Sequence, residues 1–119
     1  MAVNQGPMTE ATYYILLSLM KPGHGYGMMQ RIRELSGGRI EMGPGTMYGV
    51  LTRMNKEGLI ELTGEDGRRK NYAITEEGKK VLREEYKRLK QLVKDGALLE
   101  EGEAKEVLQI LANKWEKIQ

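Results

Sequence analysis

The sequence contains no cysteine and only one histidine, His24. Without thiols the chain cannot form disulfides, thiolate metal sites or cysteine redox switches. One histidine and glutamates scattered along solvent-facing segments make no convincing metal site, so we predict no metal and no other cofactor. The serines at 18 and 36 lie within or at the end of predicted helices and form no nucleophile–base pair with His24. We therefore assign no catalytic residues and do not expect an enzyme.

Long apolar runs are also absent. No run approaches the roughly 20 residues that a membrane-spanning helix needs. The first residues, MAVNQGPMTE, have no cationic stretch followed by an apolar one, so we predict no signal peptide. We expect a cytoplasmic protein with no membrane partner. The formal net charge of +2 is too small to indicate nucleic acid by itself, so any such argument depends on where the charges lie.

The stretch from Gly43 to Thr75 is the most informative part of the chain. Pro44 suits the first turn of a helix and Gly58 suits its end. Apolar residues recur between them at helical spacing. They are Met47, Val50, Leu51 and Met54. This pattern predicts a helix with one buried stripe.

The opposite face of this predicted helix is small, polar and basic. It carries Gly45, Gly49, Thr52 and Lys56, with Tyr48 and Arg53 on its flanks. Two strands are predicted after the helix, over residues 59–63 and 71–74, with a turn between them that carries Arg68, Arg69 and Lys70. A bare helix face can sit deep in a DNA groove, and cations at a hairpin tip can neutralise phosphates. The alternative is an ordinary amphipathic helix with a solvated turn.

The preceding residues predict two more helices. Thr9 can cap a helix that runs to about Met20, and a second is predicted over roughly 25–36. We also expect one short strand over residues 39–42. Three helices followed by a hairpin are the order of a winged helix-turn-helix, in which the third helix reads the major groove. The predicted fold class is mainly α with a small β-hairpin wing, followed by a C-terminal dimerisation helix.

A long charged helix is predicted after Thr75, which can cap it. Its apolar residues follow the a/d spacing of a helix that packs on another helix. They are Leu82, Tyr86, Leu89 and Val93. We expect dimerisation through this seam; the alternative is that the helix folds back on its own domain. Residues 1–75 would form the DNA-binding domain and 76–119 the dimerisation segment, with a last helical stripe, over 104–118, as either a separate helix or a continuation.

Three separate pieces of the sequence resemble the PadR-like transcriptional regulators, particularly the short subfamily with one C-terminal helix. The pieces are YYILLSLMKPGHGYGMMQRI, GPGTMYGVLTRMNKEGLIE and GRRKNYAITEEGKKVL, in that order. The resemblance covers roughly residues 9–95 and implies a dimeric winged-helix protein, in most cases a repressor. The chain departs from the family at Gly49, where a proline or another larger residue is usual, and in its longer tail.

The resemblance implies DNA contacts by Thr46 and Tyr48 and by the three wing cations. Spacing alone adds Thr52 and Lys56 to the same face, and we interpret Arg53 as a phosphate contact or a surface ion pair. The expected partners are double-stranded DNA with a pseudo-palindromic operator and a second copy of the chain.

The resemblance also implies a flat aromatic or cationic effector at the dimer interface. Tyr13, Tyr14 and Trp115 are its candidate contacts. The alternative is that Trp115 only anchors the tail. We therefore predict a sequence-specific transcriptional regulator, a homodimeric repressor that an effector releases. The alternative function is a winged-helix protein–protein interaction module that does not bind DNA.

Overall fold

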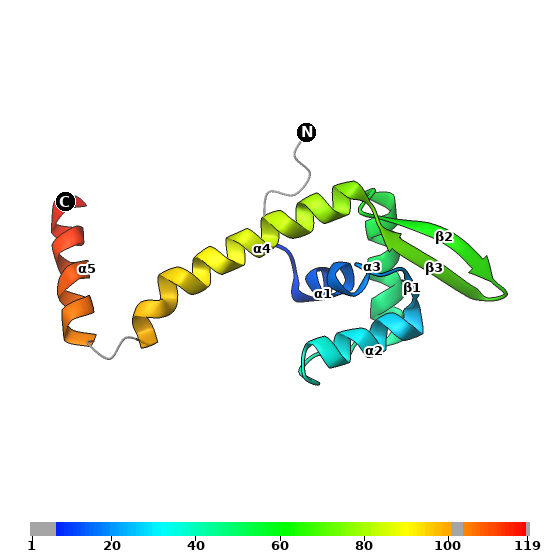
Figure 1. The fold of residues 1–119 in the computed structure, drawn as a ribbon, viewed down its shortest axis with the longest axis horizontal. Helices are drawn as coiled ribbons and strands as arrows, with labels where there is room; N and C mark the ends of the chain where they lie inside the picture. The colour runs from blue at the N-terminus through cyan, green and yellow to red at the C-terminus, as the bar shows by residue number, and fades with distance from the viewer. Residues whose placement is uncertain (1–6, 101–103, 119) are drawn as a thin grey trace. The chain divides into compact units, whose positions relative to one another are not determined.

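The computed structural model describes residues 7–100 and 104–118. Its elements follow one another as labelled in Figure 1. They are α1 (Glu10–Ser18), β1 (Gly23–His24), α2 (Gly25–Leu35), α3 (Pro44–Lys56), β2 (Ile60–Asp66), β3 (Arg69–Ile74), α4 (Glu76–Gly96), the 3-10 helix η1 (Ala97–Glu100) and α5 (Ala104–Ile118). The chain forms two compact units, Met1–Glu85 and Tyr86–Gln119, which meet within α4.

The helices of the first unit begin where local signals predict. Thr9 caps α1, because its hydroxyl oxygen accepts a hydrogen bond from the Thr12 amide at 3.1 Å. The α1 helix ends at Ser18, two residues before the predicted end. The ring nitrogen Nδ1 of His24 accepts from the Gly27 amide at 3.4 Å and caps α2. Both predicted helices are confirmed to within about two residues.

The third helix has its predicted start and its predicted buried stripe. Pro44 is its first residue, and the helix ends at Lys56, two residues before Gly58. Met47, Leu51 and Met54 are fully buried. After β3, Thr75 connects this end of α3 to the start of α4. Its hydroxyl donates to the Gly58 carbonyl at 2.6 Å and accepts from the Gly78 amide at 3.0 Å.

The sheet has three antiparallel strands in the order β1-β3-β2. The predicted strand over residues 39–42 is wrong, because these residues form no strand. The third strand is instead β1, in which Gly23 pairs with Tyr72 and His24 pairs with Asn71. A two-residue strand has no pattern of its own and is defined by its pairing with a distant part of the chain.

The β2–β3 hairpin is longer than predicted and projects past α2 and α3 (Figure 1). Its loop consists of Gly67 and Arg68, and Gly67 has a φ of 64°. A glycine with positive φ at the first loop position fits the type II′ turn that connects twisted strands. A register shift between Leu62 and Gly64 marks a bulge in β2. The winged-helix fold is confirmed, with a three-stranded rather than a two-stranded sheet.

The hydrophobic core lies wholly in the first unit among the described residues. It is built from α1, α2, α3, the sheet and the first turns of α4. Methionines occupy several of its fully buried positions, as expected for a chain without phenylalanine.

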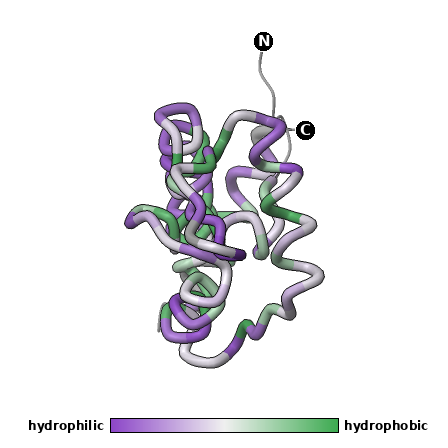
Figure 2. The backbone as a smooth tube through the Cα atoms, turned by 90° about the vertical axis from the view of Figure 1, so that its right-hand side faces the viewer, coloured by the Kyte–Doolittle hydropathy of each residue, from purple (hydrophilic) through white to green (hydrophobic). Residues whose placement is uncertain are grey.

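The second unit consists of the rest of α4, η1 and α5. Its large apolar side chains that are described are mostly more than half exposed. The residues from 104 to 118 form a helix of their own. Hydrophobic and hydrophilic residues alternate along the backbone (Figure 2). No helix in the described ranges is both long and apolar enough to cross a membrane.

Candidate nucleic-acid interface

The outer face of α3 is exposed and bare, as its spacing predicts. Gly45, Gly49, Thr52 and Lys56 are all exposed. A methyl group added at Gly45 or Gly49 would meet no atom of the chain within 4 Å. Glycine in a helix costs about 1 kcal/mol relative to alanine. Packing within the chain therefore does not explain why these two positions are glycine.

Two polar side chains of α3, those of Thr52 and Tyr48, have defined contacts within the chain. Thr52 donates its hydroxyl to the Tyr48 carbonyl at 2.8 Å, which leaves its oxygen as an exposed acceptor. The Tyr48 side chain is 46% exposed, and its hydroxyl lies so close to the Gly25 α-carbon that a Cβ there would overlap it. Burial raises the pKa of Tyr72, and the nearby Tyr48 raises it further. Tyr48 is thus fixed against the start of α2 while part of its ring meets solvent.

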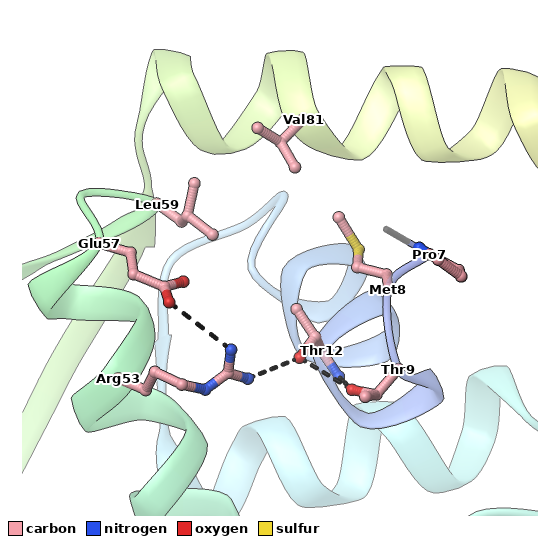
Figure 3. Close-up of a pocket in the computed structure, with 8 residues that line it drawn as sticks. All are labelled: Pro7, Met8, Thr9, Thr12, Arg53, Glu57, Leu59 and Val81. Carbon is pink, nitrogen blue, oxygen red and sulfur yellow. Dashed lines mark hydrogen bonds and ion pairs between the residues drawn. The ribbon is translucent and has the colours of Figure 1, made fainter. Parts of the chain in front are cut away.

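Arg53 turns the other way, toward α1. Its Nη2 donates to the Thr12 hydroxyl at 2.9 Å, and its Nη1 lies 3.8 Å from the Glu57 carboxylate (Figure 3). Of the two interpretations of Arg53, the structure contains the ion pair. Thr46 is exposed in the first turn of α3.

A cavity of about 150 Å³ lies beside the Arg53 guanidinium (Figure 3). Its lining residues lie before and within the first turn of α1, at the end of α3 and in the turn after it, and in α4. They are Pro7, Met8, Thr9, Thr12, Arg53, Glu57, Leu59 and Val81. The Arg53 guanidinium therefore connects α3 to α1 through the Thr12 hydroxyl.

The three wing cations are exposed but do not project together. Side chains alternate between the faces of a strand. Lys70 therefore shares a sheet face with Tyr72 and lies opposite Glu65, whereas Arg69 is on the other face with Asn71. Arg68 is in the loop. Within the described residues, no ion pair involves a wing cation or Lys56.

The sequence predictions do not include the hydrogen bonds of two side chains of α2, Tyr26 and Arg31. Tyr26 is exposed, and its hydroxyl accepts from the Gln30 side-chain amide at 3.2 Å. The i,i+4 spacing was the available signal. Arg31 bonds to three backbone carbonyls, which no local pattern indicates.

The predicted dimerisation residues fall into two groups. Leu82 is only 6% exposed and belongs to the core of the first unit, so the chain already covers it. In the second unit Tyr86 is about half exposed and Val93 is 74% exposed. Leu89 is half-buried, and the Lys90 ammonium lies 5.4 Å from the centre of the Tyr86 ring.

The predicted effector residues are also divided between the units. Tyr13 and Tyr14 are half-buried on α1 and pack edge to face, with ring centres 6.0 Å apart. Arg39 lies 5.8 Å from the centre of the Tyr14 ring and donates to its hydroxyl at 3.0 Å. Trp115 of α5 is 61% exposed. Over the ranges that the structure describes, no cluster of histidine and carboxylate side chains could hold a metal ion.

Comparison with known proteins gives one family. The model of the "Transcriptional regulator PadR-like family" matches residues 15–84. "Transcriptional regulator YqjI" of Escherichia coli K12 is 34% identical over 61 residues, which are 51% of this chain and 30% of that protein. The chain spans less than a third of the length of the curated relatives it matches.

Two solved structures show the same fold at moderate identity. A PadR family regulator from Clostridium difficile R20291 is 28% identical with a TM-score of 0.62, over 75% of this chain and 95% of that one. One from Eggerthella lenta is 28% identical with a TM-score of 0.61, over 77% of this chain and 79% of that one.

Proposed function

The chain belongs to the PadR-like family of transcriptional regulators, and we propose that it is a homodimeric repressor that binds a pseudo-palindromic operator. Family members bind DNA and function as dimers. In our proposal the two α3 helices enter successive major grooves about 34–36 Å apart. We assign DNA binding to residues 1–75 and pairing to the helical segment 76–119.

The bare outer face of α3 beside an exposed cationic hairpin is the observation that carries this proposal. The two glycines cost helix stability and serve no contact within the chain. Glycine is expected at these positions if another molecule approaches the helix backbone closely. A DNA groove is such a partner, and Lys56 at the end of the same face suits a phosphate.

We assign direct roles according to how each side chain is held. Thr52 and Thr46 present hydroxyl groups to base edges or phosphates, and Tyr48 contacts a phosphate from its flank. Lys56 and Arg68 neutralise phosphates, together with whichever of Arg69 and Lys70 lies on the hairpin face toward the duplex. Arg53 contributes indirectly, because its guanidinium holds α3 against α1.

The exposed apolar side chains of the second unit support pairing with a second copy. Tyr86, Leu89 and Val93 recur at a/d spacing on a charged helix, and Tyr86 and Val93 are more than half exposed. We propose that this seam packs on its equivalent in the partner.

We also propose that an effector causes the protein to release the operator. Trp115 offers an exposed ring for stacking, whereas one face of Tyr14 is already close to Arg39. We therefore rank Trp115 above Tyr13 and Tyr14 as the effector contact.

A binding titration tests the function. The purified protein is titrated against DNA from upstream of its own gene and against scrambled DNA at near-physiological salt. We expect a preference of about 1,000-fold or more for the upstream fragment. Equal, salt-sensitive binding to both fragments would contradict sequence-specific regulation at this site. No binding even at low salt would instead favour the protein–protein interaction module.

A further inference from the structure

The Arg31 side chain turns back from α2 to the end of α1. Its Nη1 donates to the carbonyls of Ser18 at 2.7 Å and Lys21 at 2.6 Å, and its Nη2 donates to that of Pro22 at 3.1 Å. The last carbonyls of a helix and the turn after it have no partner within the helix. One half-buried guanidinium therefore fixes the path of the chain between α1 and β1.

The same guanidinium also lies against β1. A Cβ added at Gly23 would be 2.9 Å from Nη1 and 3.1 Å from Nη2 of Arg31. Gly23 in turn pairs with Tyr72 of β3. A continuous series of contacts thus runs from α2 through the guanidinium and β1 to the wing.

We infer that Arg31 is a positioning residue for the wing, which sets where the hairpin stands relative to α3. The inference rests on the proposed role of the wing in DNA binding. β1 has only two residues, too few to hold its place by pairing alone. Arg31 fixes the turn that leads into it, so the place of β3 depends on this side chain. Arg31 itself does not contact DNA.

Lysine cannot replace arginine in this role. The planar guanidinium reaches three carbonyls with two nitrogen atoms, whereas an ammonium group is a point charge without a fork. Arg31→Lys therefore keeps the charge that a phosphate contact would need but loses the geometry that positioning needs. Arg33 is the matched control, because it is exposed on the same helix and pairs only at 3.7 Å with Glu41.

Hydrogen exchange tests the positioning without DNA. In Arg31→Lys we expect the amides of β3 to exchange about tenfold faster, the effect of losing one charge-assisted hydrogen bond. The buried stripe of α3 should keep its protection, and Arg33→Lys should change neither. Gly23→Ala, which places a methyl group against the guanidinium, should accelerate the same amides. Unchanged β3 exchange, or equal acceleration in α3, would overturn the inference.

A double-mutant cycle tests the consequence for DNA. Arg31→Lys should weaken DNA binding about tenfold in the natural chain and not at all in a chain that carries Arg68→Ala, Arg69→Ala and Lys70→Ala. An equal loss in both backgrounds would show that Arg31 acts independently of the wing and would overturn the inference. If the wing variant binds DNA as tightly as the natural chain, the proposed wing contact fails instead, and the exchange experiment alone decides the role of Arg31.

Discussion

The two units of the chain differ in how far their apolar side chains are buried. In Met1–Glu85 the helices and the sheet enclose a core of fully buried leucines, isoleucines and methionines. In Tyr86–Gln119 the described large apolar side chains are mostly exposed, with Val93 and Trp115 among them. The first unit therefore buries its apolar side chains by its own contacts, whereas we propose that the second covers its apolar surface with a partner.

The first unit engages Arg31, Arg39 and Arg53 in hydrogen bonds within the chain. It leaves the outer face of α3 and the wing cations uncommitted. We propose that the first unit meets DNA at these two surfaces. In our proposal the apolar side chains of the second unit are exposed because they pack on a second copy of the chain.

Leu89→Asp should have the largest effect, because it places a charge in the proposed seam of the second unit. We expect a monomer whose operator affinity is lower by a factor on the order of 10²–10⁴, the gain that linking two binding modules provides. Analytical ultracentrifugation and operator titration measure the two effects. Gln91→Asp adds the same charge at an exposed position of α4 and should change neither. If Leu89→Asp stays dimeric and binds the operator as tightly as the natural chain, the second unit does not pair through this seam.

The wing cations should have the next largest effect, and the two on β3 should be unequal. Arg69 and Lys70 leave the hairpin from opposite faces, so a duplex along one face is reached by only one of them. Alanine in place of the cation on the duplex-facing side should flatten the slope of log affinity against log salt by about one unit. Alanine at the other should leave the slope unchanged. Titrations over a range of salt concentrations decide, and two unchanged slopes would remove the wing from the interface.

Gly49 should separate folding from binding. Gly49→Ala and Gly49→Gln replace a helical glycine that has free space around it, so both should raise the free energy of unfolding by about 0.5–1 kcal/mol. The glutamine should nevertheless weaken operator binding, because its side chain fills the face that approaches the groove. Thermal unfolding and titration measure the two changes. A glutamine variant that binds as tightly as the natural chain would show that DNA does not meet this face.

Arg53→Met should have the smallest effect on binding. Its guanidinium is held by Thr12, so the loss should appear as about 0.5–1.5 kcal/mol of stability, the value of one hydrogen bond, and leave the salt slope unchanged. Lys56→Met removes a cation from the outer face of the same helix and should lower the slope by about one unit. A lower slope in Arg53→Met together with an unchanged slope in Lys56→Met would place DNA on the α1 side of α3.

Local signals were enough to predict most of the fold. Thr9, Pro44 and Thr75 mark helix starts through side-chain or ring chemistry that acts within a few residues of the chain. The apolar stripe of α3 follows from spacing alone, and its bare outer face follows from the same spacing.

The features that the sequence did not reveal depend on contacts between distant residues. β1 is a strand only because β3 pairs with it some fifty residues later. The directions of Arg31 and Arg53 depend on carbonyl and hydroxyl groups of α1 and the turn after it. Leu82 fits the a/d seam by spacing, yet tertiary packing places it in the core.

The most direct test of the account is amide chemical-shift mapping of the natural chain with a duplex DNA at low salt, where even a nonspecific duplex binds. We predict that the largest changes fall on Gly45, Gly49 and Thr52 of α3 and on the loop at Gly67. The amides of Met20 and Lys21 should change little. Changes centred on these two amides, or no changes at all, would contradict a DNA interface made of α3 and the wing.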